Sequence, residues 1–292
     1  MVETPESARG RAYVGVSGWR YPRWRGDFYP KGLVQRRELA YIGEQMTSVE
    51  INGSFYSLQR PESYRRWRGE VPSDFSFAVK GSRYISHMLR LRDVEQALAN
   101  FFASGVLALG SQLGPILWQL PARQRFEAEV VAAFLDALPT TTGEALDLAR
   151  HHDARLDGRA WLEIESDRPI RYALEPRSAD FADAAALDLL SQHGVSLVIA
   201  DTAGTWPRFD ALTADFVYVR LHGAQALYAS GYTGVELRAW ADSVQGWVEG
   251  TATGDGRPRD VFVYFDNDAR GFAPHDARTL VGMLEDGGRV SG

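Results

Sequence analysis

The sequence predicts an α/β fold, a (β/α)8 TIM-like barrel in a single domain. Short β-type runs alternate with amphipathic helical runs, which is the pattern of parallel βα units. Eight such strands in 292 residues match the count of a closed barrel, and a 45% share of hydrophobic residues suffices for one large core. No glycine-rich phosphate fingerprint follows the first strand, which disfavours the structural alternative, a doubly wound open sheet.

The strands and helices are predicted from these runs. The strands are Tyr13–Ser17, Ser48–Asn52, Ser76–Lys80, Ile116–Leu120, Arg171–Glu175, Ser196–Ala200, Val217–Leu221 and Val261–Phe265. The helices are near Arg36–Gln45, Pro61–Arg68, Asp93–Ala103, Phe126–Leu138, Phe181–His193, Val235–Glu249 and Asp276–Leu284. Pro61 suits the first turn of its helix, and Asp93 is predicted to cap the next one.

Two segments lie outside this pattern. Residues 1–10 are polar and are predicted to be disordered, which leaves 11–292 as the barrel domain. Residues 140–168 form a longer, partly apolar insertion between the fourth helix and the fifth strand. Such a connection lies on the N-terminal face of a barrel, away from the usual active site. We therefore interpret His151 and His152 as surface residues rather than ligands.

Composition restricts the function classes. The chain has no cysteine, which excludes disulfides, thiolate metal sites and cysteine nucleophiles. The N-terminus has no apolar core typical of a signal peptide, and no apolar run approaches the ~20 residues of a membrane span. We expect a soluble, cytoplasmic protein with no membrane partner. The sequence carries no signal of an oligomeric state.

The charge is distributed unevenly along the chain. The formal net charge is -6, yet residues 1–92 carry 16 Lys and Arg against 9 Asp and Glu, and residues 93–292 carry 16 against 29. This asymmetry suggests one positive surface on an acidic body. Chance clustering of solvated arginines is the alternative.

Polar residues end every predicted strand on its inward face. Alternate residues of a barrel strand point inward, and catalytic groups lie at the C-terminal strand ends. The inward residues at or just after these ends are Ser17, Glu50, Asn52, Lys80, Gln119, Glu175, Arg177, Asp201, Tyr218, Arg220, His222, Tyr264 and Asp266. These charges could simply neutralise one another. We favour function, because desolvation can cancel the Coulomb gain of buried pairs, and coupled groups in a cleft are typical of active sites.

The loops after the first three strands combine arginines with aromatic residues. Such loops suit phosphate contacts and stacking on a ring or sugar. Trp19, Tyr56 and His87 are the candidates for ligand contact in these loops. Trp24 and Tyr29 suit packing at the barrel mouth equally well.

Five motifs follow one another along nearly the whole chain. They are Gly15-x-Ser17-Gly18-Trp19-x-Tyr21-x-x-Trp24-x-Gly26-x-Phe28-Tyr29-Pro30, Val49-Glu50-Ile51-Asn52-x-Ser54-Phe55-Tyr56, Phe77-x-x-Lys80 with His87, Leu113-Gly114-Pro115-x-Leu117-x-Gln119-Leu120-Pro121, and Tyr218-x-Arg220-x-His222-Gly223. Together they are specific, and the chain resembles the DUF72 (YecE-like) family. The resemblance implies a TIM-like barrel and a site, but no substrate.

The sequence departs from the family pattern at a few positions. Glu175 to Phe181 reads Glu-Pro-Arg-Ser-Ala-Asp-Phe where the family usually has Glu-x-Arg-x-x-Ser-Trp. Ser86 replaces a threonine, Asp266 replaces an asparagine, and the 140–168 insertion looks extra. The core polar set is kept, so these departures concern the fine shape of the pocket.

The first functional hypothesis is an enzyme without a tightly bound metal or other cofactor. It would act on an anionic, phosphorylated sugar-like or nucleotide-like substrate by acid/base chemistry. The catalytic candidates are Glu50, Glu175, Asp201 and His222. The substrate-binding candidates are Trp19, Asn52, Tyr56, Lys80, His87, Gln119, Arg177, Arg220, Tyr264 and Asp266.

Two alternatives stay open, so catalysis itself is not settled by the sequence. A divalent-metal hydrolase or nuclease would use ligand types present at Glu50, His87, Glu175, Asp201, His222 and Asp266. Lys80, Arg177 and Arg220 at the same level would repel the metal, so no metal ligand is assigned. A non-catalytic nucleic-acid or nucleotide binding protein would use the arginine and aromatic rim, but it would not need a ring of ionisable strand ends.

Overall fold

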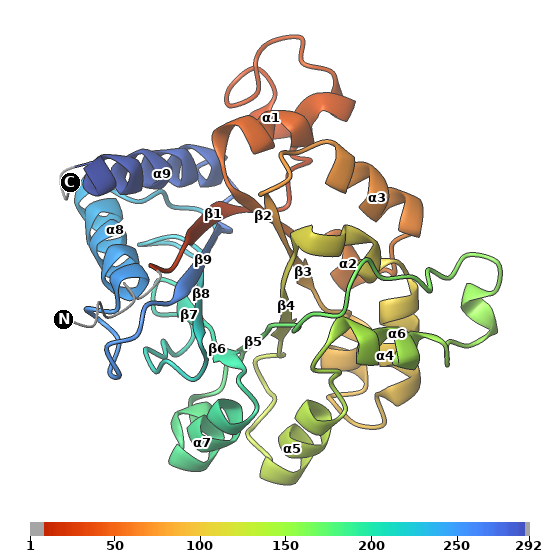
Figure 1. Cartoon of the computed structure of the whole chain (residues 1–292). Coiled ribbons are helices and arrows are strands. Elements are labelled where there is room, and N and C mark those ends of the chain that lie inside the picture. The colour runs from red at the N-terminus through yellow and green to blue at the C-terminus, as the bar shows by residue number, and fades with distance from the viewer. Residues whose placement is uncertain (1–8, 290–292) are drawn as a thin grey trace, which may run out of the picture.

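A computed structural model, which describes residues 9–289, shows a parallel barrel surrounded by helices (Figure 1). The sheet has nine strands in the order β6-β5-β4-β3-β2-β1-β9-β8-β7, and every pairing is parallel. The prediction of a single TIM-like α/β barrel is therefore confirmed. No helix within residues 9–289 is long and apolar enough to cross a membrane.

All eight predicted strands are present, and one of them is divided. The strands are β1 (Ala12–Ser17), β2 (Ser48–Ile51), β3 (Ser76–Lys80), β4 (Leu113–Gln119), β5 (Tyr172–Glu175), β6 (Ser196–Leu197), β7 (Ile199–Asp201), β8 (Phe216–Leu221) and β9 (Asp260–Phe265). The predicted sixth strand is interrupted at Val198, so that β6 pairs with β5 while β7 pairs with β8. This division explains the ninth strand. It also marks the point where the ring stays open, because β6 and β7 are the two ends of the sheet.

The helices lie outside the ring of strands (Figure 1). They are α1 (Glu38–Gln45), α2 (Gly53–Tyr56), α3 (Pro61–Gly69), α4 (Glu95–Ala103), α5 (Ala128–Asp136), α6 (Thr142–Ala149), α7 (Ala184–Gln192), α8 (Gly234–Glu249) and α9 (Ala273–Arg289). Pro61 occupies the first turn of α3 as predicted. The cap predicted at Asp93 is wrong: Val94 precedes α4, and Asp93 has a left-handed backbone with φ of 50°. Aspartate tolerates this conformation, and here it lies in the bend that precedes Val94.

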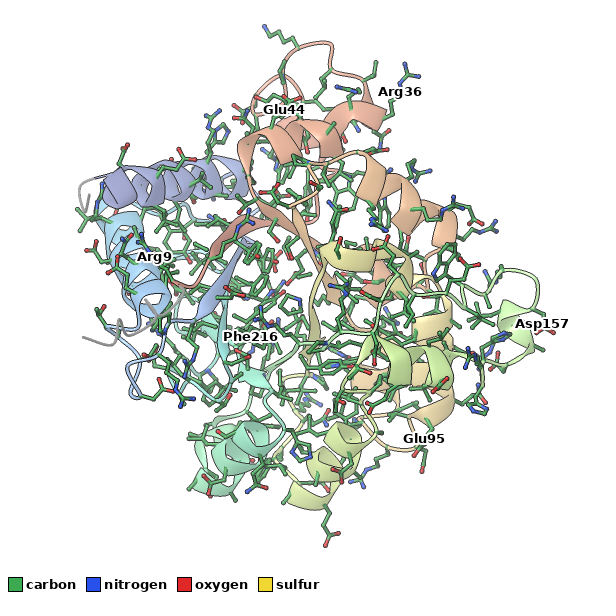
Figure 2. The ribbon with its side chains drawn as sticks, viewed as in Figure 1. Arg9, Arg36, Glu44, Glu95, Asp157 and Phe216 are labelled. Atoms are coloured by element: carbon green, nitrogen blue, oxygen red, sulfur yellow. The ribbon has the colours of Figure 1, made fainter. Side chains whose placement is uncertain are left out.

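The barrel interior below the strand ends is filled by side chains. Period-two alternation places Tyr218 and Tyr264 in the interior cluster, as predicted, together with Ala78 and Phe262. The rings of Tyr13 and Phe262 stack with 4.6 Å between centroids. Figure 2 shows Phe216 within the ring of strands, whereas the labelled charged residues lie at the periphery. The interior is therefore a packed core, and ligands can reach only its ends.

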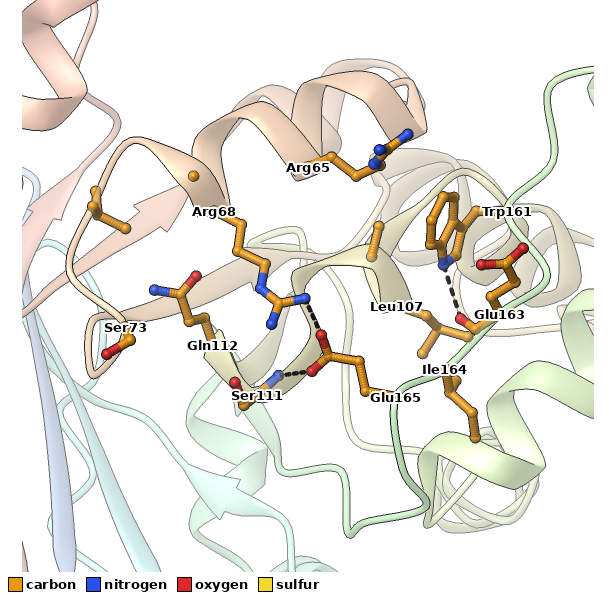
Figure 3. Close-up of a pocket in the computed structure, with 13 residues that line it drawn as sticks. Arg65, Arg68, Ser73, Leu107, Ser111, Gln112, Trp161, Glu163, Ile164 and Glu165 are labelled. Atoms are coloured by element: carbon orange, nitrogen blue, oxygen red, sulfur yellow. Dashed lines mark hydrogen bonds and ion pairs between the residues drawn. The ribbon is translucent and has the colours of Figure 1, made fainter.

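The 140–168 insertion packs on the outside of the barrel. It contains α6, and the Asn100 side-chain amide on α4 donates to the Asp153 carboxylate over 3.0 Å. Its later part lies beside α3 and borders a pocket of about 530 Å³ whose lining includes Arg68 and Trp161 (Figure 3). His151 is exposed, and the His152 ring contacts the Asp153 backbone carbonyl. Both histidines therefore lie on the outside of the barrel with the rest of the insertion.

The start of the described chain contacts α8. Arg9 forms an ion pair with Glu249 at 2.9 Å, and the Gly10 backbone N–H donates to the Val248 carbonyl over 3.0 Å. These two residues belong to the segment predicted to be disordered. Residues 1–8 of that segment lie outside the described residues.

Candidate functional site

Arg220, at the end of β8, is the centre of a buried charge network at the C-terminal strand ends. Its side chain is fully buried. Its Nη2 lies 2.8 Å from Glu50 Oε1 and 3.0 Å from Asp266 Oδ2, and its Nη1 lies 2.8 Å from Glu175 Oε2. These carboxylates come from β2, β5 and the end of β9, so one guanidinium joins three parts of the barrel.

Glu50 has hydrogen bonds to both of its carboxylate oxygens. The strand register places Ser17 beside Glu50, and the Ser17 hydroxyl donates to Oε1. The Tyr218 hydroxyl donates to Oε2 over 2.7 Å, and Arg220 contacts both oxygens. Asn52 joins the same network by donating to Ser17 Oγ over 3.1 Å. Glu50 is therefore held in place as a partner of Arg220.

Glu175 differs because one of its oxygens has no hydrogen-bond partner. Oε2 accepts from Arg220, whereas the buried Oε1 accepts no hydrogen bond in the described structure. Oε1 lies 3.6 Å from Arg177 Nη2 and 3.7 Å from His222 Nε2. Burial alone would raise the pKa of Glu175, but the charges of Arg220, His222 and Arg177 hold it well below its usual range. Glu175 is thus an ionised carboxylate with a free lone pair.

His222 lies between two carboxylates. Its Nδ1 is 3.2 Å from Asp266 Oδ2, on the side opposite its contact with Glu175. Burial and Arg220 lower the pKa of His222, but Asp266 and Glu175 outweigh them and raise it above its usual value. The pKa of Asp266 is lowered, because Arg220 and His222 outweigh its burial. This arrangement favours an imidazolium that can donate a proton.

A second group of cations lies next to this network. Arg177 stacks on the Trp206 ring, with Cζ 3.6 Å from the ring centroid, and donates to the Tyr228 hydroxyl over 3.2 Å. Lys80 Nζ lies 4.7 Å from the Phe55 ring centroid. Stacking fixes these cations while leaving much of their hydrogen-bonding capacity free for an anion.

His87 adds a titratable group beside these cations. Its ring lies edge-on to Phe55 with 5.2 Å between centroids. Burial lowers the pKa of His87, and the charges of Lys80, Arg177 and Arg83 lower it further. The local potential is therefore positive, which favours a bound anion.

The segment that carries His87 has an unusual backbone. Tyr84–Met88 is a π-helix, and Arg90, Leu91 and Asp93 follow with left-handed φ angles of 52°, 68° and 50°. A π-helix is rare, and where one occurs it often lies at a functional site. Residues other than glycine with a left-handed backbone store strain. Both features support a functional role for this loop.

The structure joins most of the candidate residues predicted from the sequence. The contact network consists of Glu50, Asn52, Glu175, Arg177, Arg220, His222 and Asp266, and Lys80 and His87 lie beside it. Gln119 is buried at the end of β4, in register with Glu175.

Four candidates lie away from the network. Trp19 packs edge-on against Trp67, and Tyr56 is 70% exposed on the rim. Asp201 accepts a hydrogen bond from the Ala203 backbone within its own turn, at 3.3 Å. Tyr264 lies deeper in the barrel, where its hydroxyl is 2.7 Å from Ser48 Oγ. Trp24 and Tyr29 are also buried, which favours packing for both.

Sequence reasoning missed two residues that position Arg177. Trp206 provides the stacking ring and Tyr228 provides the hydroxyl. Both lie in the loops that follow β7 and β8, which belong to the catalytic face of a barrel. That placement was the available signal for both residues.

The acidic residues converge on Arg220 rather than on an open point between them. Within residues 9–289, no group of three or more His, Asp or Glu side chains is arranged to hold a metal ion. The donor set near Arg220 therefore fits an internal ion-pair network better than a metal centre.

Comparison with known proteins identifies the family. A family model described as "Protein of unknown function DUF72" matches residues 13–291. The chain belongs to the DUF72 family. It is 31% identical to YecE of Escherichia coli over 128 residues, which is 44% of each chain, and 31% identical to YunF of Bacillus subtilis over 71 residues, which is 23% of each. The matched stretch thus spans less than half the length of these curated relatives.

Solved DUF72 structures share the fold. A DUF72 protein from Thermotoga maritima aligns with a TM-score of 0.73 at 22% identity, covering 94% of this chain and 99% of the other. A DUF72 protein from Enterococcus faecalis aligns with a TM-score of 0.69 at 17% identity, covering 94% and 95%. At these identities the likeness concerns the fold alone, and it agrees with the nearly closed barrel described above.

Proposed function

We propose that this DUF72 protein is an enzyme that acts on a small anionic substrate by acid/base chemistry. The substrate would be phosphorylated and sugar-like or nucleotide-like. The observation that carries this proposal is the buried Glu175 Oε1, which lacks a hydrogen-bond partner and lies within 4 Å of both Arg177 and His222. These two neighbours compensate its charge, and an oxygen that accepts no hydrogen bond suits a group that must receive a proton.

Glu175 would accept a proton from the substrate, and His222 would donate one. The lowered pKa of Glu175 keeps it ionised and able to accept a proton, although it makes the carboxylate a weak base. The raised pKa of His222 keeps a proton available for donation. Two neighbouring groups with pKa values pushed apart are typical of an acid/base pair. Glu50, whose oxygens are both bonded, would orient Arg220 rather than react.

The anionic part of the substrate would bind next to this pair. Arg177 has a side chain that is only partly buried and is fixed by Trp206 and Tyr228. Lys80 and His87 would line the same side of the site, from β3 and from the π-helix Tyr84–Met88 that follows it. A guanidinium held by stacking retains donors for two phosphate oxygens.

A second candidate function is non-catalytic binding of nucleotides or nucleic acid. The observation that favours it is the exposed rim, where Tyr56 is 70% and Tyr84 is 43% exposed, with the exposed Arg60 and Arg83 beside them in sequence. Exposed rings and arginines are typical of stacking surfaces for single strands. This reading leaves the unsatisfied Glu175 oxygen without a role.

The proposal is tested by incubating the purified protein with a mixture of sugar phosphates and nucleotides. Mass spectrometry of the mixture would then follow consumption of each compound. We expect at least one compound to be converted by the wild type and not by Glu175→Gln. The matched control is Glu163→Gln, because Glu163 is an exposed carboxylate in the insertion. Conversion that is equal in Glu175→Gln and wild type would contradict the acid/base assignment.

A further inference from the structure

Lys80 stands out among the cations of this chain. Of 32 Lys and Arg residues only two are lysines, Lys31 and Lys80. Lys31 is exposed, whereas Lys80 is 8% exposed at the end of β3. Arginine is the better residue for a buried cation and for binding phosphate through two parallel hydrogen bonds. A chain that uses arginine for nearly every other cation thus has, at this buried position, a side chain with an amine.

The amine of Lys80 has no partner that would hold it as an ammonium group. Among the described residues, no carboxylate oxygen lies within 4 Å of Nζ, and no side chain accepts a hydrogen bond from it. Its Nζ lies 4.7 Å from the centroid of the Phe55 ring. The backbone of Lys80 is fixed, because its carbonyl accepts from Ser54 Oγ over 2.6 Å within a paired strand.

The surrounding charges do not require Lys80 to be protonated. The carboxylates of Glu50, Glu175 and Asp266 contact Arg220, with His222 and Arg177 beside them. Burial lowers the pKa of Lys80 and Arg220 lowers it further, while the more distant Glu50, Asp266 and Glu175 oppose the shift without reversing it. His87 is the remaining titratable group close by, and it also packs on Phe55.

We propose that Lys80 is a nucleophilic amine that forms an imine with an aldehyde or ketone group of the substrate. The inference rests on the proposed function for the anionic part of that substrate and names its reactive part, a carbonyl carbon. The neutral amine attacks this carbon, and the carbonyl oxygen takes up a proton to give a carbinolamine. One proton of the attacking nitrogen then passes to that oxygen, the C–O bond breaks as the oxygen departs as water, and the protonated imine remains. No oxidant or reductant is needed.

The imine is tested by trapping with a reductant. The probe is pyridoxal phosphate, an aldehyde that carries a phosphate, added to the native protein at neutral pH with cyanoborohydride. Reduction by this reagent makes the adduct permanent, and peptide mapping locates a mass gain equal to that of the probe less one oxygen atom. We expect Lys80 to be labelled faster than Lys31, because burial lowers the pKa of Lys80 and thereby raises the fraction of neutral amine. Dihydroxyacetone phosphate is the second probe.

Two matched variants decide the result. Lys31→Arg should keep the labelling of Lys80. Lys80→Arg should lose that labelling, because a guanidinium stays protonated and is a poor nucleophile. Circular dichroism checks that both variants fold as the wild type does. Equal labelling of Lys31 and Lys80, or labelling of the Lys80→Arg variant at the wild-type rate, would overturn the inference.

Inorganic phosphate separates this inference from the proposed function. If phosphate binds to the wild type and no probe labels Lys80, the imine is wrong and the anion site stands. If Lys80 is labelled only by aldehydes without phosphate and phosphate does not bind, the nucleophile stands and the anionic substrate is wrong. Labelling of Lys80 that phosphate slows by competition would support both.

Discussion

Arg220 and Glu50 form a two-point contact between strands that are not neighbours in the sheet. Arg220 Nε lies 3.1 Å from Glu50 Oε2 and Nη2 lies 2.8 Å from Oε1. Glu50 belongs to β2 and Arg220 to β8, and the strands β1 and β9 lie between them. The pair is fully buried, so the charge of each side chain is stabilised by the opposite charge of the other.

Replacing Arg220 by methionine should destabilise the fold strongly. The change would leave Glu50, Glu175 and Asp266 buried without their shared cation, and breaking a buried pair typically costs about 3–5 kcal/mol. Urea unfolding measures the loss. The control is Arg208→Met, since Arg208 forms an exposed pair with Asp210 and such pairs contribute about 1 kcal/mol or less. Equal losses in the two variants would refute the central role of Arg220.

Stability should fall in acid because of the buried carboxylates. The pKa values of Glu175 and Asp266 are lowered in the folded state, so the unfolded chain binds more protons below about pH 5. Their contribution is present above the unfolded values of about 4 and is lost as the pH falls through the folded values. Urea midpoints between about pH 3 and pH 7 should show a weaker dependence in Glu175→Gln than in Glu163→Gln. Parallel curves would contradict the shift at Glu175.

Raising the pH should remove a different contribution. The pKa of His222 is raised in the folded state, so its stabilisation is present below the unfolded value of about 6.5 and is lost as the pH rises through the folded value. His222→Gln should flatten the fall in urea midpoint above about pH 6.5. An unchanged slope in that variant would assign the fall to another group.

A bound anion should raise the pKa of His87. Burial and the charges of Lys80, Arg177 and Arg83 lower this pKa in the free protein, and phosphate would offset those charges. By linkage, phosphate should bind more tightly as the pH falls through the His87 titration. Histidine side-chain NMR with and without phosphate measures the shift. His193, which contacts Asp136 outside the site, serves as the reference and should not move.

Gly110→Ala should destabilise the contact between the barrel and the insertion but spare the site. Gly110 has φ 55° and ψ -133°, a conformation nearly restricted to glycine, and a Cβ would lie 2.5 Å from atoms of Arg68 and Glu165. Figure 3 shows these two side chains forming an ion pair. Backbone strain of this kind costs about 1–3 kcal/mol. Gly158→Ala, where no atom lies within 4 Å of the added Cβ, should lose less. Phosphate affinity should be unchanged in both variants.

Much of the fold could be predicted because barrel strands have a strict period of two. The polar positions 50, 175, 220, 222 and 266 were assigned inward from that period alone, and their contacts with Arg220 follow from strand register. The break at Val198 and the missing cap at Asp93 were not predicted. Both depend on tertiary contacts that a local pattern does not contain.

The site was harder to predict where loops supply its residues. Tyr228 reaches Arg177 with a left-handed φ of 60°, and Trp206 stacks on it from a loop with no regular structure. Periodicity carries no information about such segments. Trp19 illustrates the converse, because an aromatic residue in a mouth loop packs on Trp67 instead of facing the site.

Calorimetric titration with inorganic phosphate and ribose 5-phosphate measures whether an anion binds beside Glu175. Wild type, Arg177→Met and Arg208→Met would be compared, because Arg208 also lies over a tryptophan ring, at 5.0 Å from Trp240, but outside the network. We predict that both ligands bind the wild type and Arg208→Met equally, and that they bind Arg177→Met about tenfold or more weakly, as expected for loss of a charged hydrogen bond. Failure of both ligands to bind the wild type, or equal affinity in all three proteins, would contradict the account.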